Sequence, residues 1–362
     1  MRTPAFVRRF RFFGVLTVVS VYLLILVGGI VRSTGSGMGC PDWPKCFGTW
    51  VPPTDISQLP ADYKEVYTAQ RVAKNKRLAA TLERFGFQQV ASNIFAHPTQ
   101  YIETDFNPVK TWIEYVNRLV GALIGVFVFL TAVLAWPYWR RDRTVFWLAF
   151  SAFILTGVQG WLGSLVVSTN LLPIMITVHM GLALLIVAML IYAVERSQRE
   201  AIEVERGSEA PVATGMSGWL WLIVVLTFAQ IVLGTQVREQ VDLVATANGY
   251  LQRQTWIDQL GGVFAVHRTF SAVLLLLNAY VVYQLYRQPN RRLQRLASVV
   301  IGVIVVEILA GVTLAYFSLP AAVQPVHLLL GTLLFGAQFV LLLAYRHARK
   351  TVEQAVFPRV VA

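Results

Sequence analysis

The sequence contains little charge and few cysteines, and each scarcity excludes a class of protein. Charged residues make up 14% of the 362 residues, against about 25% in soluble proteins, so most of the chain is not a soluble domain. The two cysteines form neither a CxxC nor a CxxCH pattern, which excludes a cysteine zinc site and covalent haem attachment. The net charge of +12 lies in short clusters between apolar runs, without the basic and aromatic platform that binds nucleic acid. No nucleic-acid partner is therefore expected.

The sequence contains long apolar stretches with few charged residues. Eight of them are long enough to cross a hydrocarbon layer of about 30 Å. Backbone in lipid must satisfy its own hydrogen bonds, so each is predicted to be a helix. The first begins like a signal peptide but has no small-residue cleavage site, and we interpret it as a retained helix. We predict an all-α integral membrane protein with eight transmembrane helices near residues 12–32, 116–138, 145–167, 174–194, 217–238, 264–286, 296–317 and 325–345.

Basic residues in the short connections predict the orientation of these helices. They occur at the N-terminus, after the second and sixth spans, and in the tail, whereas the connections 168–173 and 317–324 carry no charge. Both termini are therefore expected in the cytoplasm. Two polar segments, 33–110 and 239–263, are expected outside, and the composition and spacing of residues 64–85 predict a helix in the first.

The two halves of the sequence resemble each other. A glutamine or glutamate precedes a glycine by four residues in three spans, and in two of these a histidine follows the glycine after sixteen residues. These residues are Gln159, Gly163 and His179; Gln230 and Gly234; and Glu307, Gly311 and His327. We predict two pseudo-symmetric four-helix bundles arranged as parallel repeats. The N-terminal half would span residues 1–195, a cytoplasmic linker 196–216, and the C-terminal half 217–362.

Three histidines are predicted near the outer membrane surface. His179, His267 and His327 each lie in the first turns of a helix that enters from outside, and Asn117 has the fourth equivalent position. Intramembrane polar side chains are functional candidates, although an interfacial histidine can instead bond to a carbonyl or water. Neutral imidazole is an axial ligand of haem iron. His267 and His327 could hold a haem in the second half, while the first offers His179 and a weak or open position.

A carboxylate and several arginines lie at the same predicted depth. Glu114 precedes Asn117 by three residues and shares its helical face, where it is either a proton acceptor beside a haem or an interfacial residue. Four arginines are candidates for contacts to haem propionates or for membrane-edge anchors: Arg32, Arg118, Arg238 and Arg268. Cys40 and Cys46 lie on the oxidising side, where a disulfide would hold the loop in place.

Several of these segments resemble the haem A synthase family. They are GGIVRSTGSGMGCPDWPKCFGTWVPP (28–53), WIEYVNRLVGALIG (112–125) and the later motifs TVHMG, AVHR and PVHLLLG, and they cover nearly the whole chain in order. The resemblance implies oxidation of the C8 methyl of haem O to a formyl group, which gives haem A for terminal oxidase biogenesis. Implied partners are the haem O substrate, haem O synthase, an electron acceptor and the lipid bilayer, with a homo-oligomer left open.

The resemblance also assigns roles to residues. It implies a haem b cofactor between His267 and His327, a substrate haem at His179 and position 117, and an essential Glu114. Position 117 is Asn where the family pattern has His, so either the substrate iron has a single protein ligand or its ligation differs in this bacterial branch. The loop cysteine pair could be structural or redox-active. Two alternatives remain: a di-haem membrane cytochrome that relays electrons without modifying haem, and a haem transporter or chaperone.

Overall fold

The computed structural model describes residues 3–95, 103, 105–169, 171–198, 212 and 215–356, with side chains up to residue 349. In these ranges the regular secondary structure is helical, apart from one isolated bridge between Cys46 and Thr49. Eight of the described helices are long and apolar enough to cross a membrane. They are α1 (Ala5–Ser33), α4 (Pro108–Leu134), α5 (Arg143–Ser168), α6 (Pro173–Ser197), α8 (Met216–Ala247), α9 (Gly262–Tyr286), α10 (Arg291–Tyr316) and α11 (Val323–Val356). An all-helical protein with eight candidate spans is therefore confirmed.

Capping side chains determine where several of these helices begin. Asn107 accepts a hydrogen bond from the backbone N–H of Lys110 (3.1 Å) ahead of α4, and Pro108 takes the first helical position. Asp142 caps α5 and Asn290 caps α10 in the same way. Such caps satisfy N–H groups that have no partner within the helix. The second span consequently begins at residue 108, eight residues before the limit that hydropathy predicted.

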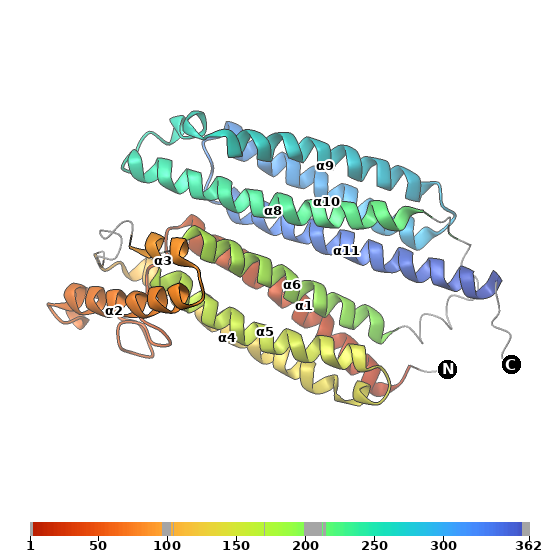
Figure 1. Cartoon of the computed structure of the whole chain (residues 1–362), viewed down its shortest axis with the longest axis horizontal. Helices are drawn as coiled ribbons and strands as arrows, with labels where there is room; N and C mark the ends of the chain where they lie inside the picture. The colour runs from red at the N-terminus through yellow and green to blue at the C-terminus, as the bar shows by residue number, and fades with distance from the viewer. Residues whose placement is uncertain are drawn as a thin grey trace.

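The long helices contact one another in two sets of four. In the first set, α1 and α5 each contact both α4 and α6; in the second, α9 and α11 each contact both α8 and α10. Contacts of α11 with α1 and α6, and of α6 with α8, join the sets. Figure 1 shows the two sets as two layers, with the start of α1 and the end of α11 at the same end of the molecule. We call the opposite end the loop end.

Close packing and polar pairs hold these helices together. A Cβ added to Gly29 on α1 would lie 2.9 Å from the Cβ of Pro325 on α11, so only glycine allows this approach between the two sets. Within the sets, the hydroxyls of Thr17 and Thr131 lie 2.8 Å apart, and Gln338 donates to Asn278 (2.9 Å). Hydrogen bonds of this kind between helices replace the water that lipid excludes.

The fifth span extends beyond its predicted limit. It was expected to end near residue 238, before a polar outer segment at 239–263, but α8 continues into that segment as far as Ala247. Its last turns pack Val241 and Ala245 against Trp256 and Leu319. Hydropathy does not detect a helix that leaves the membrane and is stabilised by packing on a connection. Of the predicted linker 196–216, residues 199–211 and 213–214 lie outside the described residues.

The segment between α1 and α4 covers the loop end of the first set. It contains α2 (Tyr63–Arg84), as predicted from composition, and a short α3 (Gln88–Ile94). α2 contacts α5, where Asn75 donates a hydrogen bond to the carbonyl of Ser168 (2.7 Å). In Figure 1, α2 and α3 lie beside the loop end of α4 and α5. A described helical layer therefore lies above the first set of spans.

Candidate functional site

Each of the three predicted membrane histidines lies against a glycine of the preceding helix. The pairs are Gly163 (α5) with His179 (α6), Gly234 (α8) with His267 (α9), and Gly311 (α10) with His327 (α11). A Cβ added to these glycines would lie 3.6, 3.4 and 3.3 Å, respectively, from the Cε1 atom of the imidazole. The missing side chain therefore provides the space in which each ring lies, which explains why the glycine recurs in the sequence.

In two of these pairs a glutamine one turn before the glycine fixes the histidine backbone. The side-chain amide of Gln159 donates to the carbonyl of His179 (2.8 Å), and that of Gln230 donates to the carbonyl of His267 (2.9 Å). Each glutamine thus holds the segment that carries its imidazole. The sequence pattern identified both glutamines, but only the structure shows that they contact the backbone.

The third pair differs because the corresponding residue is Glu307. One carboxylate oxygen of Glu307 lies 3.1 Å from Nδ1 of His327. Its other oxygen lies against α11, 3.2 Å from the position of a Cβ added to Gly331. The first contact is not an aligned hydrogen bond, since neither atom has such a partner among the described residues. Glu307 therefore contacts the imidazole itself rather than the histidine carbonyl.

His267 and His327 lie together at the loop end of the second set. Their ring centroids are 6.5 Å apart, and the ring planes make an angle of 81°. The Nδ1 atoms of both rings are buried and have no aligned hydrogen-bond partner within the part of the chain that is described. His179 belongs to the other set, on α6. The structure therefore brings two of the three histidines side by side, with their ring planes nearly perpendicular.

The fourth equivalent position, Asn117 on α4, lacks these surroundings. By the register of the repeat, the residues that match Gln230 and Gly234 are Leu24 and Gly28 on α1. Leu24 cannot donate a hydrogen bond, and a Cβ added to Gly28 would meet no described atom within 4 Å. The Oδ1 atom of Asn117 is buried and has no hydrogen-bond partner among the described residues. This corner of the first set combines open space with a polar group that lacks a described partner.

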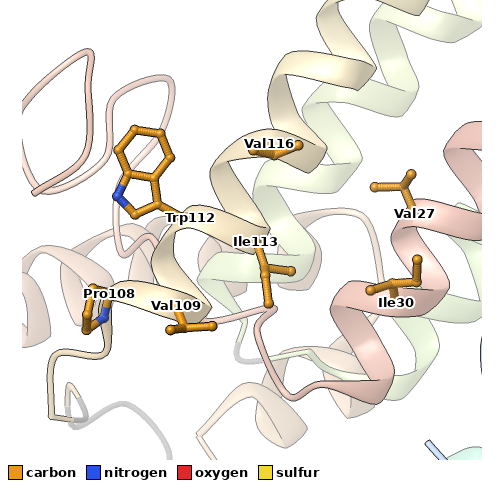
Figure 2. A pocket seen from close by; sticks show the side chains of 7 residues that line it. All are labelled: Val27, Ile30, Pro108, Val109, Trp112, Ile113 and Val116. Carbon is orange, nitrogen blue, oxygen red and sulfur yellow. The ribbon is translucent and has the colours of Figure 1, made fainter. Parts of the chain in front are cut away.

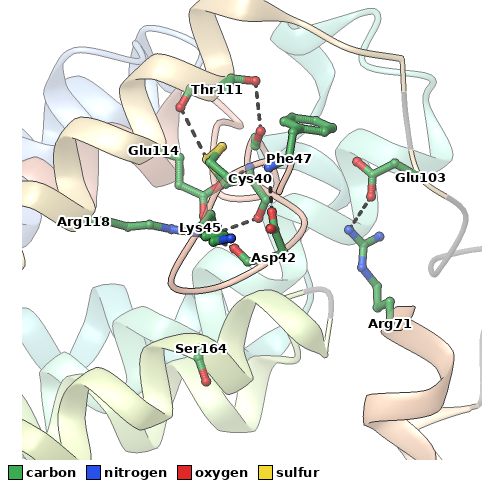
Figure 3. A network of polar contacts seen from close by, with 12 residues as sticks. Cys40, Asp42, Lys45, Phe47, Arg71, Glu103, Thr111, Glu114, Arg118 and Ser164 are labelled. Carbon is green, nitrogen blue, oxygen red and sulfur yellow. Dashed lines mark hydrogen bonds and ion pairs between the residues drawn. A yellow bond between two sulfur atoms is a disulfide. The ribbon is translucent and has the colours of Figure 1, made fainter. Parts of the chain in front are cut away.

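Glu114 is buried beneath the loop that the disulfide Cys40–Cys46 closes. The backbone N–H of Cys40 donates to its carboxylate (2.9 Å), and Arg118, one turn later on α4, forms an ion pair with it. Arg118 also donates to the carbonyls of Cys40 (2.9 Å) and Asp42 (2.6 Å). Figure 3 shows this network of the loop with α4. Glu114 and Arg118 therefore connect the disulfide loop to the first set of helices.

The other three predicted arginines also have partners within the protein. Arg32 on α1 forms an ion pair with Asp242 on α8, and Arg238 lies 2.8 Å from the same carboxylate. The guanidinium of Arg268 lies 5.9 Å from the centre of the Phe264 ring. Asp242 could not be singled out from the sequence because it lies beyond the predicted end of the fifth span, at residue 238. Its only local signal was its position four residues after Arg238.

α2 brings further charged groups to the loop end that the sequence analysis did not single out. Arg71 and Glu103 form a buried ion pair of 2.6 Å, visible in Figure 3. Burial raises the pKa of the Glu103 carboxyl above its ordinary value. Lys74 lies 3.5 Å from the carbonyl of Ser164, and burial, together with nearby Arg118, lowers its pKa. Contacts between segments so distant in sequence leave no local pattern.

An apolar pocket of about 580 Å³ lies between α1 and the beginning of α4 (Figure 2). Its lining residues are Val27, Ile30, Pro108, Val109, Trp112, Ile113 and Val116. The indole N–H of Trp112 is buried and has no hydrogen-bond partner in the described ranges. The lining contains neither a histidine nor a carboxylate, so the pocket is separate from the polar residues of the candidate site.

Comparison with known proteins gives a consistent result. Residues 11–92 and 86–339 match the family described as COX15-CtaA, cytochrome oxidase assembly protein. A protein named heme A synthase from Bradyrhizobium sp. strain BTAi1 is 27% identical, over 95% of this chain and 93% of its own. Heme A synthase of Alkalihalophilus pseudofirmus is 24% identical, over 91% and 95% of the two chains. Because the family match extends over most of the chain, this protein belongs to the COX15-CtaA family of cytochrome oxidase assembly proteins.

Proposed function

We propose that this chain is a haem A synthase, a membrane oxidoreductase that oxidises the C8 methyl of haem O to a formyl group. The family match and the names of its relatives support this function. The observation that carries it in this chain is the pair His267 and His327, whose ring centres lie 6.5 Å apart.

The spacing of this pair fits haem iron. Two metal–imidazole bonds of about 2 Å, with roughly 1 Å more from each nitrogen to its ring centre, place two axial rings about 6 Å apart. The observed separation of 6.5 Å agrees with that value. Gly234 and Gly311 keep the necessary space open. We therefore assign His267 and His327 as ligands of a haem b cofactor, which would supply one-electron transfer.

The first set of helices is the proposed substrate site. His179 is the ligand for the iron of haem O, with its backbone held by Gln159 at 2.8 Å. Asn117 occupies the opposite position. An amide is a poor iron ligand but can donate a hydrogen bond, so the substrate iron keeps one position weakly bound or open. Open space beside Gly28 is consistent with a ligand at this corner.

Glu114 is the proposed proton acceptor. Oxidising a methyl to a formyl group with water as the oxygen source removes protons as well as electrons, and a base must be held within hydrogen-bond reach of the group that it deprotonates. Cys40 and Arg118 hold the carboxylate in one position. We place this step at the loop end, beneath the disulfide. The haem that His267 and His327 would hold would supply the electron transfer to an external acceptor.

The rest of the proposal concerns topology and partners. We propose that the two sets of helices are pseudo-symmetric halves, 1–195 and 217–362, joined by a cytoplasmic linker at 196–216. Both termini lie in the cytoplasm of a bacterial inner membrane, and the haem sites face the outer side, as the basic connections suggest. Arg32, Arg118, Arg238 and Arg268 are the proposed propionate contacts. Haem O synthase is the partner that supplies the substrate.

Pigment analysis tests this function. The chain is expressed with haem O available, purified, and its haems are extracted and identified by mass. Hydroxylated or formyl haem supports the proposal. Two haems without any modified product would instead identify an electron-relaying cytochrome, and haem O bound and released unchanged would identify a transporter. A Glu114→Gln variant that binds haem normally should make little or no haem A; full activity would remove Glu114 from the mechanism.

A further inference from the structure

We propose that Glu307 is a positioning residue that accepts a hydrogen bond from the Nδ1–H of His327 and strengthens this histidine, but not His267, as an iron ligand. The inference rests on the proposed haem site of the second half. It assigns the two axial ligands of one haem unequal strength. The consequence is a lower reduction potential than a site with two equivalent histidines would have.

Glu307 lies beside Nδ1 of His327, which leaves Nε2 as the nitrogen for the proposed iron. Its carboxylate oxygen is 3.1 Å from Nδ1, within hydrogen-bond distance, and the proposed bond forms when the two side chains align. Both side chains are partly buried, at 17% and 25% exposure, so water competes weakly for the contact. An imidazole with its proton on Nδ1 presents the lone pair of Nε2 to a metal.

The two equivalent positions of the repeat, which we call the sister positions, show how a carboxylate changes the contact to the histidine. Gln159 and Gln230 stand at the same place in the repeat, and each donates its amide N–H to a histidine carbonyl. An ionised carboxylate has no N–H and can only accept, so it cannot make that bond. Its oxygen lies 3.1 Å from Nδ1 of the ring instead. The exchange of one amide for one carboxylate therefore changes a backbone contact into a contact with the ligand itself.

A carboxylate on the outer nitrogen of a histidine ligand has a known physical effect. It fixes the tautomer and orientation of the ring and raises its basicity as a ligand. A more basic ligand, with a negative charge nearby, stabilises ferric iron over ferrous iron and so lowers the reduction potential. Such outer contacts typically change metal affinity by about 10–100-fold. The effect at Glu307 should therefore be measurable both as a potential and as an affinity.

The test is a redox titration of the second-half haem. A His179→Ala background removes the proposed ligand of the first half, so that one haem is titrated with dithionite and ferricyanide and followed by absorbance. Glu307→Gln, which installs the residue of the sister positions, should raise the midpoint potential and weaken haem binding about 10–100-fold. Glu307→Asp should lie between it and the parent. The reciprocal Gln230→Glu should lower the potential.

Glu195 provides the matched control for this test. Glu195→Gln removes a carboxylate that pairs with Arg292 (2.9 Å), away from the histidines, and should leave the potential unchanged. An unchanged potential and affinity in Glu307→Gln, or an equal shift in Glu195→Gln, would overturn the role of Glu307 while the haem site stands. A parent protein without Soret absorbance would overturn the proposed haem site together with this inference.

Discussion

Replacing Gly311 with alanine should weaken haem binding while leaving the fold intact. The added Cβ would lie 3.3 Å from Cε1, 3.9 Å from Nδ1 and 4.0 Å from Nε2 of His327. The first distance is shorter than ordinary carbon contacts of about 3.5–4.0 Å, so the ring must move by a few tenths of an ångström. A site works only when its ligands are held within about 0.5 Å. We expect haem affinity to fall about tenfold, or ~1.4 kcal/mol.

The same substitution should not destabilise the helix. Alanine is favoured over glycine in a helix by up to about 1 kcal/mol, so the apoprotein should melt at the same temperature or higher. Gly302 on the same helix is the matched control, because a Cβ there would meet no described atom within 4 Å. Haem titrations at the Soret band and thermal melts of both variants separate the effects. Wild-type haem affinity in Gly311→Ala would refute the role assigned to this glycine.

Three further predictions concern the loop end. Arg71→Met leaves Glu103 buried without its ion-pair partner (both side chains are 3% exposed) and should destabilise the loop by about 3–5 kcal/mol at neutral pH, measured by limited proteolysis. Burial raises the pKa of the Glu103 carboxyl, so the folded loop binds a proton on this carboxyl more tightly than the unfolded loop does. The stability of the Arg71→Met loop should therefore be greatest at low pH and decline as pH rises through the raised pKa. A loop that gains stability with rising pH would contradict this. Replacing Cys40 and Cys46 with serine removes a link across a sequence separation of 6 and should cost about 2 kcal/mol, seen as faster hydrogen exchange at residue 40. Asp242→Asn should lower the thermal stability only slightly, by about 1 kcal/mol or less, because that carboxylate is 39% exposed.

The spans and the glycine–histidine pairs could be predicted because each leaves a local pattern. Lipid selects long apolar stretches by composition alone, and eight such helices are present among the described residues. The spacing that links Gln159, Gly163 and His179 identified residues that lie together, since the glycine in each of the three pairs lies against its histidine. The pattern was informative because two neighbouring antiparallel helices place residues of a given sequence separation at the same height along the pair.

Other features depended on contacts that no local pattern encodes. The extension of α8 to Ala247 is stabilised by packing on Trp256 and Leu319, and hydropathy does not register it. The partners of Glu114, which are Arg118 and the backbone N–H of Cys40, 74 residues away in sequence, could not be identified from the sequence. The same holds for the partners of Arg32 and Arg238.

The sequence by itself determined the candidate membrane-spanning helices and the glycines that accommodate the histidines, because composition and spacing act within one or two helices. Only the tertiary structure decided the distance and angle between His267 and His327, and that Glu307 contacts an imidazole where Gln159 and Gln230 hold a backbone carbonyl. A side chain's partner depends on the direction in which it points and on what lies there. Those depend on how separate helices pack, which no single stretch of sequence specifies.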